Sequence, residues 1–148
     1  MRSLVIALAA LLPVASFAAE SASDRLCAAA LTEGGLAAEV EQMIDDGAYP
    51  FESPDQLLTL NCGNGKSLID NLIVGMQAEN LEYAVIDMGA NVNRPLMQQE
   101  GGKLTLMQYL IQQAVVAPSE EARAFAMDYM AELRDVDFNP NLISLSMN

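Results

Sequence analysis

The chain has 148 residues, of which 7 are Lys or Arg and 20 are Asp or Glu, so its formal net charge is −13 at pH 7. This length is typical of a single domain. The sequence contains no His, which excludes a Ser-His-Asp triad, a Cys-His pair and a His-ligated zinc site. Nucleic acids and anionic membrane surfaces are bound by clusters of Lys and Arg, so the acidic excess argues against both. We expect a small acidic protein that is not an enzyme and needs no cofactor.

The first 18 residues have the pattern of a secretory signal peptide. Arg2 is followed by a short apolar run, and small residues at Ser16 and Ala18 precede the expected cleavage after Ala18. The alternative is a membrane anchor, but a span needs about 20 apolar residues and this run is shorter and contains Pro13. We therefore expect a mature domain over 19–148 that is exported to the bacterial periplasm, or beyond it, and is not inserted in the membrane.

The chain contains two cysteines, Cys27 and Cys62. An even number of cysteines in an oxidising compartment favours one disulfide bond between them. The alternative is a pair of buried free thiols, because Cys27 lies in a helical pattern and Cys62 in a loop.

Two stretches of the chain repeat one another. Residues 36–51 and 78–93 each carry a helical apolar stripe that closes in Ile-Asp-x-Gly-Ala, at Gly47 and at Gly89. A weaker third copy follows. Self-similarity with a period of about 30–50 residues predicts a solenoid of helix-turn-helix units. The expected units cover 25–51, 65–93 and 102–139.

Local rules predict where the helices begin and end. Ser23 or Asp24 is expected to cap a first helix over about 24–32, and Gly47 to end a second helix over 36–46 in the left-handed conformation. Pro118 and Ser119 are expected to start the last helix. Apolar residues at helical spacing predict the four helices after the second. Their apolar positions are Leu68, Leu72, Ile73 and Met76; Leu81, Val85, Ile86 and Met88; Leu106, Tyr109, Leu110 and Ala114; and Phe125, Met127, Met130 and Leu133.

The pattern resembles ankyrin repeats, which open with G-x-T-P-L-H-x-A and close with L-L-x-x-G-A-D-x-N. Residues 84–93 match that close almost position for position, and residues 43–48 match it less completely. Residues 65–68 and 105–107 stand in for the opening, but lack its Pro and His. The resemblance covers roughly 25–139. It implies an all-α fold, a short ankyrin-like solenoid with extended loops where stretches are inserted at 49–64 and 94–102.

Two other motifs are weaker. Residues 65–67 are similar to the end of a phosphate-binding loop, but Leu60 stands where that motif needs its first Gly. We interpret them as a turn before a helix capped by Asn64 or Ser67. The oxygen-bearing residues over 135–139 alternate as in calcium loops, but the following Gly and the distal Glu are missing. We therefore expect no metal site.

The resemblance implies a function in binding. Ankyrin-like stacks have no built-in chemistry and present a concave face of inner helices and projecting loops that binds another protein. The loops here are 49–64 and 91–103. A basic protein partner is expected, because complementary charge speeds encounter and fixes orientation. The predicted contact residues are Tyr49, Phe51, Glu52, Asp55, Arg94, Met97, Gln98, Gln99 and Glu100.

Several alternatives stay open at this point. If the protein binds another protein, the most specific function that we consider is that of a monomeric periplasmic immunity protein, which inhibits a toxic secreted enzyme. The alternative is a structural or protective envelope protein, in which exposed Met residues take up oxidant or the chain supports an enzyme. Tyr49, Phe51 and Phe138 follow the helix ends, where they are either partner contacts or part of the core.

Overall fold

The computed structural model describes residues 20–63, 65–99 and 102–135, so the expected signal peptide lies outside it. The described chain is mostly helical, which confirms the helical class. No helix in these ranges combines the length and the apolar character needed to cross a membrane. The elements in chain order are α1 (Ala22–Ala29), α2 (Gly35–Asp45), α3 (Pro54–Leu58), α4 (Leu68–Val74), α5 (Ala78–Glu82), the π-helical turn η1 (Tyr83–Asp87), β1 (Met97–Gln99), β2 (Gly102–Leu104), α6 (Leu106–Val116) and α7 (Glu120–Leu133).

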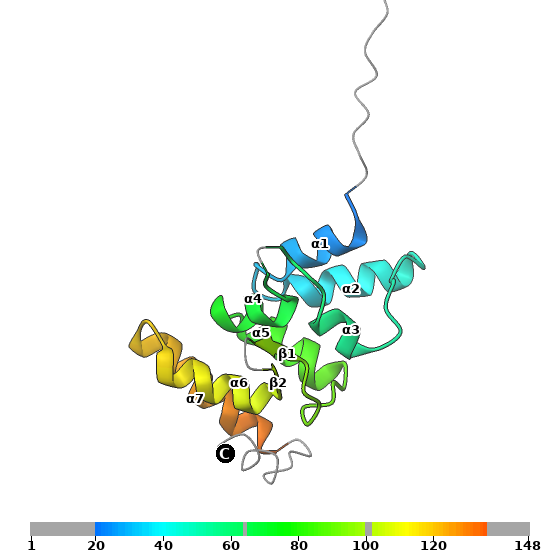
Figure 1. Cartoon of the computed structure of the whole chain (residues 1–148). Helices are drawn as coiled ribbons and strands as arrows, with labels where there is room; N and C mark the ends of the chain where they lie inside the picture. The colour runs from blue at the N-terminus through cyan, green and yellow to red at the C-terminus, as the bar shows by residue number, and fades with distance from the viewer. Residues whose placement is uncertain (1–19, 64, 100–101, 136–148) are drawn as a thin grey trace, which may run out of the picture.

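Apart from the short helix α3, the described helices form three sequential pairs. α1 packs against α2, α4 against α5, and α6 against α7. The pairs follow one another through the molecule, from blue and cyan through green to yellow and orange (Figure 1). One hydrophobic core joins them, and its fully buried side chains come from every pair. Among the largest of these are Leu26, Leu36, Met43, Leu72, Leu81, Leu110 and Leu133.

Side-chain caps start the first helix of each pair. Ser21 caps α1, slightly earlier than expected, and accepts a hydrogen bond from the N–H of Asp24 at 3.1 Å. Ser67, one of the two expected caps, and Thr105 start α4 and α6 in capping boxes. In each box the third helical residue returns a hydrogen bond to the cap, so the local sequence alone specifies where these helices begin.

Gly47 and Gly89 end their helices as expected. Both adopt the left-handed conformation, with φ of 66° and 70°. After each glycine, the N–H of the next alanine donates to the carbonyl five residues before it, at 2.8 and 2.9 Å. This is the closure of a Schellman motif, which satisfies carbonyls that the helix leaves unpaired. The two sequence copies therefore end in the same backbone geometry.

The helix that precedes Gly89 is not regular, contrary to the prediction. It begins as α5 and widens into η1, a π-helical turn. A π turn accommodates one more residue than an α-helical turn. Leu81, Ala84 and Val85 are all at most 2% exposed, so the wider turn keeps these three side chains in the core.

Both expected extended loops contain regular structure, and this corrects the prediction. Within 49–64 lies α3, which starts at Ser53 with Pro54 in its first turn. Proline suits that position because the first N–H of a helix has no partner in the helix. Within 94–102 lies most of an antiparallel hairpin, in which Met97 faces Leu104, Gln98 faces Lys103 and Gln99 faces Gly102.

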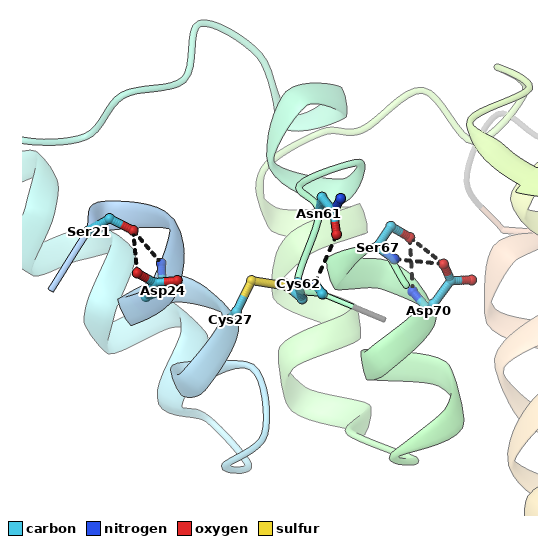
Figure 2. The surroundings of a disulfide bond; sticks show 8 residues. Ser21, Asp24, Cys27, Asn61, Cys62, Ser67 and Asp70 are labelled. Atoms are coloured by element: carbon cyan, nitrogen blue, oxygen red, sulfur yellow. Dashed lines mark hydrogen bonds between the residues drawn. A yellow bond between two sulfur atoms is a disulfide. The ribbon is translucent and has the colours of Figure 1, made fainter. Parts of the chain in front are cut away.

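The expected disulfide bond between Cys27 and Cys62 is confirmed. The two Cα atoms lie 5.5 Å apart. The bond joins α1 to Cys62 (Figure 2). Residues 60–63 pair with 65–68 in antiparallel fashion, with the N–H of Cys62 donating to the carbonyl of Lys66 at 2.9 Å, and we call these residues the 60–68 hairpin. The bond thereby ties the start of the first helix pair to the segment that leads into α4.

Candidate functional site

The β1–β2 hairpin has one apolar and one polar face. Residues directly opposite each other on paired strands share a face, and successive residues alternate between faces. Met97 and its partner Leu104 face the core, where Met97 is 1% exposed. The next pair, Gln98 and Lys103, is exposed on the opposite face.

The burial of Met97 corrects one predicted contact residue. Its side chain belongs to the core and is not accessible to a partner. A loop over 91–103 would expose the side chain of Met97 to a partner. In the strand β1, successive side chains point to opposite faces, so Met97 points to the core while Gln98 points to solvent.

A polar groove lies where α3, the 60–68 hairpin and the β1–β2 hairpin meet, with a volume of about 560 Å³. We call it the interhairpin groove. Asp55, Arg94 and Gln98 of the predicted contact residues line it. Gln99 lines a smaller hollow that shares Lys66 and Gln98 with the groove. The lining residues are Ser53, Asp55, Gln56, Thr59, Asn61, Gly65, Lys66, Ser67, Asp70, Arg94, Leu96, Gln98 and Lys103.

The groove reverses the charge balance of the chain. Among the described residues, the basic side chains of Lys66, Arg94 and Lys103 line it, and the acidic side chains that do so are Asp55 and Asp70. Positive charge is thus concentrated in one place on a protein whose formal net charge is −13.

Asp55 forms an ion pair with Arg94. This contact links α3 to the segment that follows η1, and the side chain of Asp55 is only 14% exposed. The side chain of Arg94 remains 61% exposed. A guanidinium group carries five N–H donors, so Arg94 keeps hydrogen-bonding capacity toward the groove.

Asp70, the second carboxylate, is also engaged. It accepts hydrogen bonds from the N–H of Ser67 at 2.8 Å and from the hydroxyl of Ser67 at 2.7 Å (Figure 2). Burial first, and then the charge and hydrogen-bonding capacity of the nearby Asp70, raise the pKa of Tyr109 of α6. Asp70 therefore connects the groove to the third helix pair.

The two lysines of the groove differ from Arg94. Lys66 and Lys103 are exposed, and within the described ranges neither ammonium group lies within 4.0 Å of a carboxylate oxygen. Lys66 comes from the 60–68 hairpin and Lys103 from β2, so two separate segments supply unpaired positive charge to one groove.

Tyr49 and Phe51 lie outside the groove lining. Their rings pack edge to face with centroids 5.6 Å apart, and both are half-buried against the core. Burial and then the neighbouring Tyr83 raise the pKa of Tyr49. The aromatic pair combines the two alternatives left open by the sequence, since each ring is part core and part surface. Glu52 is exposed, and its N–H donates to the side chain of Gln56 at 2.8 Å.

Other predictions fall on residues that the structure does not describe. Glu100, Phe138 and the end of the third expected unit lie outside the described ranges. Within those ranges, no group of three or more Cys, Asp or Glu side chains is arranged to hold a metal ion.

Sequence reasoning missed Lys66 and Lys103 as site residues. A signal for them was present, because each directly follows a glycine in a segment that leads to a capped helix, in Gly65-Lys66 and Gly102-Lys103. Both glycines have positive φ, 73° and 130°; Gly65 lies in the turn of the 60–68 hairpin and Gly102 is the first residue of β2. The recurrence of Gly-Lys before α4 and α6 therefore marks equivalent hairpins.

No family model, curated protein or solved structure gives a significant match to this chain.

Proposed function

We propose that this chain is a non-catalytic, exported protein-binding module, and that its partner docks on the interhairpin groove. The observation that carries the proposal is the convergence of α3 and two hairpins on one polar groove. The ion pair of Asp55 with Arg94 holds α3 against the segment that leads into β1. Exposed charged and amide side chains held on a rigid frame are typical of a recognition surface.

The ankyrin-like interpretation is part of this proposal. Three features support it: the sequential helix pairs, the identical closures at Gly47 and Gly89, and the capping boxes at Ser67 and Thr105. In a stack of such units, the segments that precede each pair lie along one side and form a continuous binding surface. The 60–68 and β1–β2 hairpins hold that position here, before α4 and α6.

The proposed location is the bacterial periplasm. The disulfide bond between Cys27 and Cys62 supports an oxidising compartment. A formal net charge of −13 would steer a partner of opposite net charge toward the protein over long distances. A periplasmic inhibitor of a basic secreted toxin, that is, an immunity protein, is the most specific function of this kind.

The alternative role in taking up oxidant has less support. Met43, Met97 and Met107 are at most 3% exposed, and buried thioethers are poor targets for oxidants in solution. Met76 and Met127 are exposed, but they lie on different helix pairs.

Photo-crosslinking tests the proposal directly. A photoreactive amino acid at Gln98, in the groove, should produce a covalent adduct with a single protein partner in the cells that make this chain. The same residue at Glu120, at the exposed start of α7, is the matched control and should produce no such adduct. Equal adducts at both positions, or none at Gln98, would contradict the proposal.

A further inference from the structure

We infer that the interhairpin groove recognises an acidic peptide segment of the partner, whose carboxylates pair with Lys66 and Lys103. The inference rests on the proposed function, because it names what the groove binds. A partner can have a basic net charge and still carry one acidic segment. The net charges of the two proteins affect how fast they associate, whereas the groove side chains determine which segment of the partner is bound at contact.

Two cationic side chains line the groove without a carboxylate partner among the described residues. Lys66 and Lys103 enter the groove from different hairpins, and among the described residues neither has a carboxylate partner. Two ammonium groups on one groove form a site for negative charge that the described part of the chain does not fill.

Both described acidic side chains of the groove are already engaged. Asp55 pairs with Arg94 and is largely buried. Asp70 accepts two hydrogen bonds from Ser67 and lies close to Tyr109. These contacts hold both carboxylates away from the lysines, so that a ligand would meet the ammonium groups.

The amide side chains of the groove favour a peptide over a simple anion. The side-chain amides of Gln56, Asn61 and Gln98 line the same groove. An amide offers both a donor and an acceptor, which matches the alternating N–H and C=O groups of an extended peptide. Gln98 lies directly across from Lys103 in the hairpin, so one strand pair presents an amide and a cation side by side.

The charge outside the groove argues against large polyanions. A membrane surface or a nucleic acid extends beyond a groove of about 560 Å³ and would meet the acidic remainder of the chain. A short acidic segment fits within the groove and avoids that repulsion.

A peptide-binding measurement tests the inference. The probes are labelled hexaglutamate and hexaglutamine peptides, with binding followed by fluorescence anisotropy in about 0.15 M salt, where the Debye length of about 8 Å screens distant charges. Wild-type protein should bind hexaglutamate at least about tenfold more tightly than hexaglutamine. Lys66→Gln with Lys103→Gln should remove about tenfold of the affinity for hexaglutamate.

The control is a double variant with the same change in net charge. Arg123→Gln with Arg134→Gln removes two positive charges from the exposed surface of the last helix and its end, away from the groove. It should change hexaglutamate binding by less than about twofold. Lys66→Arg with Lys103→Arg keeps both charges and should retain binding. The contacts that Lys66 makes in its hairpin use its backbone N–H and carbonyl, to Gly63 and Cys62, so we expect these variants to keep the fold.

The inference is wrong if wild-type protein binds hexaglutamate and hexaglutamine equally. It is also wrong if both double glutamine variants lose the same affinity for hexaglutamate. Full displacement of hexaglutamate by inorganic phosphate at matched charge would likewise contradict it, because the groove would then bind any anion. If the adduct at Gln98 persists in the Lys66→Gln, Lys103→Gln protein at unchanged yield, the acidic-segment inference fails and the proposed function stands. If Gln98 forms no adduct at all, the proposed function fails.

Discussion

Asn80 of α5 caps α2, a helix of the preceding pair. Its Oδ1 accepts a hydrogen bond from the N–H of Leu36, the second residue of α2, at 3.0 Å. The N-cap position of α2, directly before the helix, is Gly34, which has no side chain to provide a cap. A Cβ atom at Gly34 would lie 2.9 Å from a carboxylate oxygen of Glu79, and its φ of 71° favours glycine. The cap therefore comes from a residue that is distant in the sequence.

The capping is reciprocal. Glu33, in the turn before α2, accepts a hydrogen bond from the N–H of Glu79 at 2.5 Å. Glu79 is the second residue of α5, whose own cap residue, Gln77, forms no side-chain cap. The first two helix pairs thus each cap the second helix of the other, and this connects them through polar contacts as well as the core.

Asn80→Ala should lower the free energy of unfolding by about 2–3 kcal/mol. Asn80 is fully buried, and its amide also donates to the carbonyl of Thr32 at 2.7 Å. Truncation would therefore leave buried donors and acceptors without partners. Urea unfolding followed by circular dichroism measures the change. Gln112→Ala, on an exposed position of α6, is the control and should stay within about 0.5 kcal/mol. Equal stability of the two variants would argue against cross-capping.

Gly89→Val should lower the free energy of unfolding by about 1–3 kcal/mol, because a β-branched residue is strained at φ 70°. A Cβ atom at Gly89 would meet nothing within 4 Å, so a steric clash does not contribute. The melting temperature should fall by several degrees. An unchanged melting temperature would show that the left-handed closure contributes little to stability.

Met76→Gly should have the opposite effect. Met76 ends α4 in the left-handed conformation with φ 53°, and the N–H of Gln77 donates to Leu72 as in the glycine closures. Glycine relieves the strain, but it also has more freedom in the unfolded chain, so the expected gain is about 0.5–1 kcal/mol. The side chain is 41% exposed, so little packing is lost. A less stable variant in the same urea assay would mean that the methionine packs favourably at this turn.

Removal of the disulfide bond should cost about 3–4 kcal/mol on the chain-entropy model. Cys27 and Cys62 are 35 residues apart, so the bond closes a moderately long loop. The Cys27→Ala, Cys62→Ala variant should unfold at lower urea than oxidised wild type and at about the same urea as reduced wild type. Thiol titration of the denatured, unreduced protein should detect no free thiol; two thiols per chain would contradict the bond.

Stability should decrease at alkaline pH. Burial, as the first cause, raises the pKa of all four tyrosines, Tyr49, Tyr83, Tyr109 and Tyr129. Above about pH 10 the unfolded chain loses tyrosine protons that the folded chain retains, so the free energy of unfolding falls as pH rises. This stabilisation is fully present below the unfolded pKa. Each tyrosine contributes at most about 1.4 kcal/mol per pH unit.

Urea unfolding between about pH 8 and 11 measures this effect. In Tyr129→Phe, the free energy of unfolding should fall less steeply with rising pH. The variant also loses the hydrogen bond that the Tyr129 hydroxyl donates to the carbonyl of Leu81 at 3.0 Å, so its stability at neutral pH should be lower. A constant free energy of unfolding over that range would contradict the pKa shifts.

The sequence by itself determined the features that depend on near neighbours. The caps at Ser67 and Ser119 and the closures at Gly47 and Gly89 involve hydrogen bonds over three to five residues, so a short window contains all the partners. The pairing of Cys27 with Cys62 was predictable because the chain has only two cysteines. The helical class was predictable because apolar residues recur three and four positions apart over most of the chain.

Only the tertiary structure decided the features that join distant segments. Three-residue strands are too short to show their alternation, so the burial of Met97 depended on the pairing of β1 with β2 and on the core beneath. The π turn of η1 follows from core packing and has no local signal. Asn80 reads as an ordinary helical polar residue, because the N–H it caps lies 44 residues earlier. The interhairpin groove exists for the same reason: Lys66, Arg94 and Lys103 become neighbours only when the helix pairs pack against one another.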